Sequence, residues 1–155
     1  MKKIVVMSDN HGVDGMMDYI RSLEPDADYY IHCGDSEADD TELLEDFICV
    51  RGNNDWSIDL PDEQVIKIEG VPIYITHGHR FGYFNRELAM NDALTRHHCK
   101  ILFSGHTHVP MFEQEGDFYY INPGSTTLPR GGSPRSYAVV MLDKDHVECQ
   151  FKTLE

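Results

Sequence analysis

Side chains that commonly bind metal ions recur directly after short apolar segments of this chain. Seven residues share this position: Asp9, His11, Asp35, Asn53, His77, His106 and His108. Carboxylate, imidazole and amide oxygen together suit Mn²⁺, Fe or Zn²⁺, and the absence of cysteine from the set argues against a structural zinc site. The pattern therefore predicts a catalytic metal centre rather than a structural one.

Each cluster taken alone has an ordinary explanation. Asp9 could cap a helix, and Gly34-Asp35 and Gly52-Asn53 are common in turns. Two closely spaced histidine pairs are harder to explain without a ligand: His77 with His79, and His106 with His108. Because the carboxyl ends of strands form the usual ligand crevice of α/β folds, we expect clusters at five strand ends to converge in space.

A carboxylate can bridge two ions that lie about 3.5–4 Å apart, because it has two oxygens. Asp35 stands alone between the two flanking groups and is the natural bridge, while Asn53 adds a ligand without adding negative charge. Metal binding lowers the pKa of water from about 16 toward about 7. A hydroxide held between the two ions would then be available as a nucleophile at neutral pH.

The formal net charge of the chain is −14 at pH 7. Binding to long nucleic acid or to an anionic membrane needs a basic surface, so we expect neither partner. A phosphate-bearing substrate remains compatible with this charge, because two divalent cations would outweigh the carboxylates of Asp9 and Asp35 locally. The charge therefore favours a small anionic substrate over a long polyanion.

The hydrophobic pattern outlines the elements that must position these clusters. Strands are expected at residues 3–7, 29–33, 47–50, 65–68, 73–76, 101–104, 118–121, 137–142 and 147–151, and helices at 13–23, 39–47 and 85–97. In the last helix Leu88, Ala89 and Leu94 are the candidate core contacts. The order β-α-β-α-β followed by mostly β favours a mixed α/β fold with two packed sheets flanked by helices.

Length and composition predict one domain over residues 1–155, without internal repeats or a flexible linker. The longest apolar run near the start is too short for a membrane span or a signal-peptide core, so the cytoplasm is the expected compartment. The four cysteines are widely spaced, which favours reduced thiols over disulfides. Exposed edges of two sheets would allow a homo-oligomer.

The motifs Asp9-x-His11, Gly34-Asp35, Gly52-Asn53, His77-Gly78 and Gly105-His106-x-His108 occur in a fixed order. In order and spacing the series resembles the calcineurin-like metallophosphoesterase family, in particular its small single-domain prokaryotic (YfcE-like) phosphodiesterase branch. The resemblance covers residues 4–135 and includes the loop 122–125. It implies a four-layer α-β-β-α sandwich with Asp9, His11 and His108 on one ion. It also implies Asn53, His77 and His106 on the second ion, and Asp35 on both. The hydroxide between the ions would then attack phosphorus, and the expected substrate is a small phosphodiester or phosphomonoester.

The sequence departs from the wider family after Asn53, where many members carry a histidine that protonates the leaving group. Asn54 occupies this position and cannot donate that proton, although its amide can bind a phosphoryl oxygen. Asp55 is expected to anchor a ligand histidine. His79 could contact the substrate or serve a structural role. The candidate catalytic residues are therefore Asp35, Asn54 and His79.

Some questions stay open at this stage. Trp56 could form a wall of the substrate pocket or pack in the ordinary way, and Arg80 could reach phosphate or be solvated. The cofactor expected is a pair of divalent ions, Mn²⁺ first, with Ni²⁺, Fe²⁺ and Zn²⁺ as alternatives. The competing functions are a non-catalytic protein-interaction scaffold on the same fold, and a metal-binding regulatory or storage protein. The complete set of seven ligands favours an enzyme.

Overall fold

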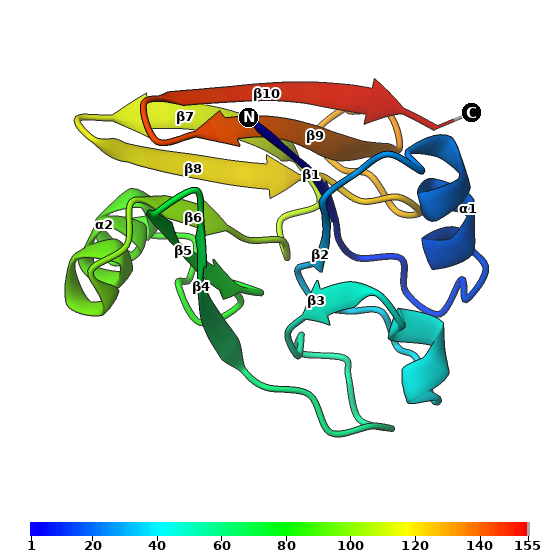
Figure 1. The fold of residues 1–155 in the computed structure, drawn as a ribbon. Helices are drawn as coiled ribbons and strands as arrows, with labels where there is room; N and C mark the ends of the chain where they lie inside the picture. The colour runs from blue at the N-terminus through cyan, green and yellow to red at the C-terminus, as the bar shows by residue number, and fades with distance from the viewer. Residues whose placement is uncertain (155) are drawn as a thin grey trace.

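The computed structural model describes residues 1–154, so the expected domain over 1–155 ends one residue outside the described range. Figure 1 shows how ten strands and three short helices follow one another along the chain. In chain order they are β1 (Lys2–Met7), α1 (Met16–Leu23), β2 (Tyr29–His32), the 3₁₀ helix η1 (Thr41–Leu44), β3 (Phe47–Cys49), β4 (Glu63–Ile68), β5 (Val71–Thr76), α2 (Arg86–His97), β6 (Ile101–Phe103), β7 (Pro110–Glu115), β8 (Phe118–Pro123), β9 (Ser136–Asp143) and β10 (His146–Thr153).

The strands form two five-stranded sheets, in the orders β10-β9-β1-β2-β3 and β4-β5-β6-β8-β7. In the first sheet β1, β2 and β3 run parallel, and Val6 lies opposite Ile31. In the second sheet β5, β6 and β8 run parallel, with Ile75 opposite Phe103 and Phe103 opposite Ile121. Parallel strands bring their carboxyl ends to one edge, so each sheet places several strand ends side by side.

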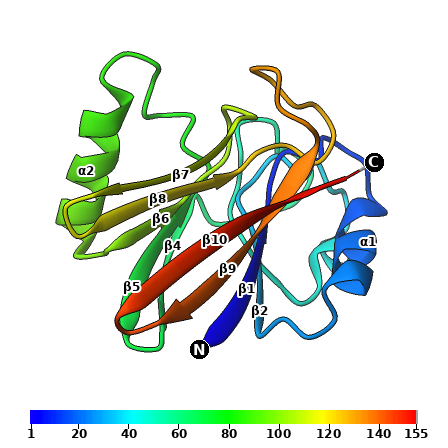
Figure 2. The ribbon, with the colours of Figure 1, turned by 90° about the horizontal axis from the view of Figure 1, so that it is seen from above.

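The two sheets pack face to face, and α1 and α2 cover the two outer faces (Figures 1 and 2). Alternation along β1 explains the layering: Ile4 and Val6 point into the core between the sheets, while Val5 and Met7 pack in the cluster that contains α1. Leu94 of α2 packs in a third cluster on the outer face of the second sheet. The expected four-layer sandwich is therefore confirmed.

Three details differ from the sequence-based expectation. Strand β7 was not predicted, because it lies at a sheet edge and its last four residues are exposed, which removes the hydrophobic alternation. The helix expected at 39–47 is only the 3₁₀ turn η1, capped by Asp40, and Phe47 already belongs to β3. Leu88 is 68% exposed, and α2 buries Met90 and Ala93 beside Leu94 instead.

No helix within residues 1–154 is both long and apolar enough to span a membrane.

Candidate metal centre

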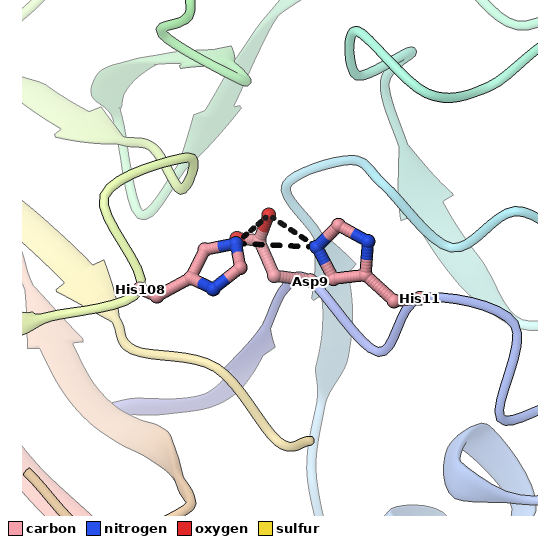
Figure 3. A group of neighbouring side chains, drawn as sticks. All are labelled: Asp9, His11 and His108. Atoms are coloured by element: carbon pink, nitrogen blue, oxygen red, sulfur yellow. Dashed lines mark hydrogen bonds and ion pairs between the residues drawn. The ribbon is translucent and has the colours of Figure 1, made fainter. Parts of the chain in front are cut away.

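Five of the seven predicted ligands come together where the parallel strands of the two sheets end. Asp9 follows β1, Asp35 follows β2 and His77 follows β5, while His106 and His108 lie in the loop after β6. Within residues 1–154 two groups have ligand atoms all within 4.8 Å of one another: Asp9 with His11 and His108, and Asp9 with Asp35 and His77. Figure 3 shows the first group, in which the two imidazoles flank the Asp9 carboxylate.

The Asp9 carboxylate lies at the centre of the cluster. Its Oδ1 atom is 3.2 Å from His108 Nε2, 3.6 Å from His11 Nε2 and 3.7 Å from His77 Nε2. Asp35 Oδ2 lies 3.3 Å from His77 Nε2 and 3.8 Å from His11 Nε2. Asp9 is thus common to both groups, and Asp35 also reaches one histidine of each ligand set expected from the sequence.

Hydrogen bonds at the far side of the rings fix which nitrogen faces the cluster. His77 Nδ1 donates to the Cys33 carbonyl at 2.8 Å, and His108 Nδ1 donates to the Leu128 carbonyl at 2.6 Å. In the neutral imidazole the other nitrogen, Nε2, then carries a lone pair, and in both rings this atom faces Asp9. Such facing lone pairs and carboxylate oxygens need a positive charge between them.

Burial of these ligand atoms strengthens the requirement for a positive charge. His77 Nε2 and Asp9 Oδ1 are both buried, and neither has a hydrogen-bond partner within the described part of the chain. Burial opposes the charged form of His77, but the adjacent carboxylates of Asp35 and Asp9 outweigh it and raise its pKa. Burial likewise opposes ionisation of Asp9, yet the adjacent imidazoles of His108 and His11 hold its pKa below the usual range. The donor set therefore fits a divalent cation.

His11 is held from outside the cluster by an acidic residue. Its Nε2 atom lies 3.1 Å from His108 Nε2, and its Nδ1 atom lies 2.9 Å from Glu37 Oε2. The sequence did not predict this contact, because Glu37 opens a run of acidic residues. Nothing in the charge pattern distinguishes Glu37 from the carboxylates that follow it.

The loop backbone around the cluster is conformationally unusual. Of the ten non-glycine residues with positive φ in the described chain, six lie here: Asp9, His11, Asp35, Glu37, His106 and His108. Aspartate and histidine enter this left-handed region more readily than most residues, and such strain concentrates at functional sites. Two glycines allow the loops to meet, because a Cβ on Gly52 would collide with the Asp35 carboxylate and one on Gly105 with Ser8.

The other two predicted ligands, His106 and Asn53, lie outside these two groups. The His106 backbone N–H donates to Asp9 Oδ2 at 3.0 Å, and its ring centroid is 5.2 Å from that of His77. Burial, together with the charge of His77, lowers the pKa of His106 to about 4, which leaves its imidazole neutral at pH 7. Asn53 is exposed and lines a neighbouring cavity of about 350 Å³.

Asn54 and Asp55 have clear structural partners. Asn54 Nδ2 donates to Asp35 Oδ2 at 3.0 Å, and the Asn54 backbone N–H donates to Asp35 Oδ1 at 2.8 Å. The Asp55 carboxylate accepts the backbone N–H groups of Asp35, Glu37 and Gly52 at 2.9, 2.8 and 2.7 Å. It was expected to anchor a histidine and instead joins the loop after β2 to the loop after β3.

His79 lies at the edge of the cluster. Its ring centroid is 5.5 Å from that of His77, and its Nδ1 atom is buried without a partner in residues 1–154. Burial lowers the pKa of His79, with a further contribution from His77. A neutral imidazole with a free nitrogen is therefore available beside the centre.

The loop 122–125 is hydrogen-bonded to the backbone of two loops that carry predicted metal ligands. Asn122 Nδ2 donates to the Gly105 carbonyl at 3.0 Å, and Ser125 Oγ donates to the Asp9 carbonyl at 2.7 Å. The loop thus ties the strand end of β8 to two of the metal-binding loops.

Comparison with known proteins adds independent information. The family model described as the calcineurin-like phosphoesterase superfamily domain matches residues 1–145. The chain is 32% identical to the probable metallophosphoesterase YsnB of Bacillus subtilis, over 96% of this chain and 89% of that protein. It is 40% identical to phosphodiesterase YfcE of Escherichia coli, although this match spans 67% of the chain and only 56% of YfcE.

Among solved structures, a conserved uncharacterised protein of Streptococcus pneumoniae, described as a predicted phosphoesterase, has a similar fold. It superimposes with a TM-score of 0.90 at 32% sequence identity, over 98% of this chain and 89% of that one.

Proposed function

This chain belongs to the calcineurin-like phosphoesterase superfamily, and on this basis we propose that it is a metal-dependent phosphodiesterase acting on small phosphate esters. The observation that carries the proposal is the pair of buried, unpartnered ligand atoms, His77 Nε2 and Asp9 Oδ1, which face each other at 3.7 Å. Relatives named as phosphodiesterase and metallophosphoesterase support the same reaction class.

The centre would hold two divalent ions. Asp9, His11 and His108 would bind one, while Asn53, His77 and His106 would bind the other. Asp35 would bridge them, which agrees with its position between His11 and His77. Mn²⁺ is the first choice for this mixed oxygen and imidazole set, followed by Ni²⁺, Fe²⁺ and Zn²⁺.

When bound, divalent metal would supply a water molecule with a pKa of about 7 and would neutralise charge on the phosphoryl oxygens. The residues of the chain do the rest of the work. Asn54 keeps both oxygens of Asp35 in place. His79 has a buried nitrogen free to hydrogen-bond a phosphoryl oxygen or the departing alcohol.

The charge of the molecule supports a small substrate. A net charge of −14 opposes a long polyanion, whereas the positive centre attracts a single phosphate group. We further infer that the chain forms one domain, because the two sheets share a continuous core. We also infer that it works in the cytoplasm, where its four free thiols would stay reduced. A homo-oligomer remains compatible with the exposed edge strand β7.

The test is a screen of small phosphodiesters and phosphomonoesters against the metal-free protein reloaded with Mn²⁺, Ni²⁺, Fe²⁺ or Zn²⁺. We expect metal-dependent hydrolysis, and we expect Asp35→Asn to abolish it and to weaken binding of both ions. If no ester is hydrolysed with any metal, the scaffold or storage function replaces the enzyme. Full turnover by Asp35→Asn would disprove the bridging role alone.

A further inference from the structure

Two cavities adjoin the metal centre on the side of His79. One has a volume of about 350 Å³ and is lined by Asn53, Trp56 and Arg51. The other, of about 430 Å³, lies between the loop after β5 and α2. Both are lined by Asp62, His79 and Arg80, so they meet at these three residues. Their sizes fall in the range of small-ligand sites.

The cavity beside Asn53 has one large apolar surface, which is Trp56. This residue is the only tryptophan of the chain, and it is 84% exposed. Covering an exposed indole with a flat ring lowers the free energy of the system. Stacking of a base on an aromatic side chain stabilises a complex by about 1–3 kcal/mol. Trp56 therefore offers a stacking surface next to a predicted metal ligand.

Two arginines line this cavity, and one of them already forms an ion pair. Arg51 is paired with Asp62, with Nη2 at 2.7 Å from Oδ1. The Asp55 carboxylate is used by backbone N–H groups. Arg80 is exposed and has no carboxylate within 4.0 Å in residues 1–154. Arg80 is therefore the arginine of this cavity that is left to pair with an anionic group of a ligand.

Taken with the proposed function, on which it rests, this geometry leads us to infer a specificity pocket. The cavity between Trp56 and Arg80 binds the part of a phosphodiester that lies beyond the scissile phosphate. It selects esters that carry an aromatic ring and a second anionic group, as a phosphorylated nucleoside does. The ring stacks on Trp56, the anion pairs with Arg80, and His79 lies between this pocket and the metal centre.

Three esters with the same p-nitrophenolate leaving group test the pocket in the Mn²⁺-loaded protein. On the side of the phosphate that does not leave, methyl p-nitrophenyl phosphate carries only a methyl group. The p-nitrophenyl ester of thymidine 5′-monophosphate adds a ring on that side, and its 3′-phosphorylated form adds the second anion. We expect kcat/KM to rise along this series. Trp56→Ala should lower it about 10-fold for the two thymidine esters only. Arg80→Ala should remove the gain from the 3′-phosphate.

Two controls separate recognition from general damage. Trp56→Phe keeps a ring and should restore most of the loss. Arg130→Ala removes an exposed cation that lines neither cavity, and should change none of the three rates. An equal fall for all three esters in Trp56→Ala or Arg80→Ala would overturn the inference.

A binding measurement keeps this test separate from the enzyme claim. Because Trp56 is the sole tryptophan, its fluorescence reports directly on the pocket. Thymidine 3′,5′-bisphosphate should quench it saturably, and Arg80→Ala should weaken that binding about 10-fold. If quenching occurs but no ester is hydrolysed, the proposed function fails and the pocket stands. If hydrolysis occurs without quenching, the pocket fails and the enzyme stands.

Discussion

Asn54 holds both oxygens of the Asp35 carboxylate, one through its backbone N–H at 2.8 Å and the other through its side-chain amide at 3.0 Å. The residue that replaces the usual proton donor of the family thus supports the proposed bridging ligand. Burial opposes ionisation of Asp35, but His77 and these bonds from Asn54 outweigh it and lower the pKa of Asp35. Asp35 is thereby held ready to bind cations.

Substitution of Asn54 should separate ligand support from leaving-group protonation. Asn54→Ala removes the 3.0 Å bond but keeps the backbone bond, so we expect metal affinity to fall by roughly 10-fold, for about 1.4 kcal/mol of lost charge-assisted bonding. Asn54→His supplies an acid, so it should speed hydrolysis of alkyl esters more than that of p-nitrophenyl esters. The check is the slope of log kcat against leaving-group pKa, and an unchanged slope would contradict it.

Glu37 should control how tightly His11 binds its ion. The carboxylate lies 2.9 Å from His11 Nδ1. Loss of such a partner typically lowers metal affinity by roughly 10–100-fold. We expect Glu37→Ala to weaken binding of one ion by about this factor, and Glu37→Gln, which keeps an acceptor, to weaken it less.

The measurement for Glu37 is a competitive chelator titration, combined with imidazole ¹⁵N spectra that report the tautomer of His11. Glu42→Gln removes an exposed carboxylate from the same acidic segment and is the matched control. The positioning role is wrong if Glu37→Ala and Glu42→Gln bind both ions equally well.

Metal binding should stabilise the fold, because the cluster brings unpartnered lone pairs and carboxylates together. At 100-fold excess over Kd each ion adds about 2.7 kcal/mol, and for a chain of this size about 1 kcal/mol shifts Tm by roughly 2–4 °C. We expect Mn²⁺ to raise Tm by about 5–10 °C per ion on this basis.

Differential scanning fluorimetry with and without a chelator checks this stabilisation. Asp9→Asn should remove most of the shift, whereas Asp117→Asn, at an exposed position in the turn between β7 and β8, should keep it. An equal shift in both variants would place the stabilising ions elsewhere.

Much of this fold and site can be predicted from the sequence, and the exceptions share a cause. The alternation in β1 and the histidine pairs after β5 and β6 depend on local patterns, which is why the layers and the cluster of Asp9 with its histidines were predictable. The contacts of Glu37 and Asn54 depend on loops with left-handed residues that bring distant segments together. No local pattern encodes such contacts, and the exposed strand β7 lacks the burial that produces a pattern.

Buried His32 should make the fold sensitive to acid. Gly34 N–H donates to His32 Nδ1 at 3.0 Å, and His32 Nε2 lies 2.7 Å from Asn10 Oδ1, so protonation at Nδ1 would break the first bond. Complete burial lowers the pKa of His32 from 6.5 to about 4. Because the folded pKa lies below the unfolded one, this stability is fully present above pH 6.5 and is lost as pH falls toward about 4.

The loss from His32 amounts to about 3 kcal/mol at pH 4, at roughly 1.4 kcal/mol per pKa unit. We expect His32→Gln to be less stable at pH 7, because it disturbs a buried bond, but to lose less stability on acidification. Urea unfolding of the metal-free protein between pH 7 and 4 measures both slopes, and the other titrating groups are common to the two proteins. Parallel slopes would mean that His32 is not the group that couples folding to pH.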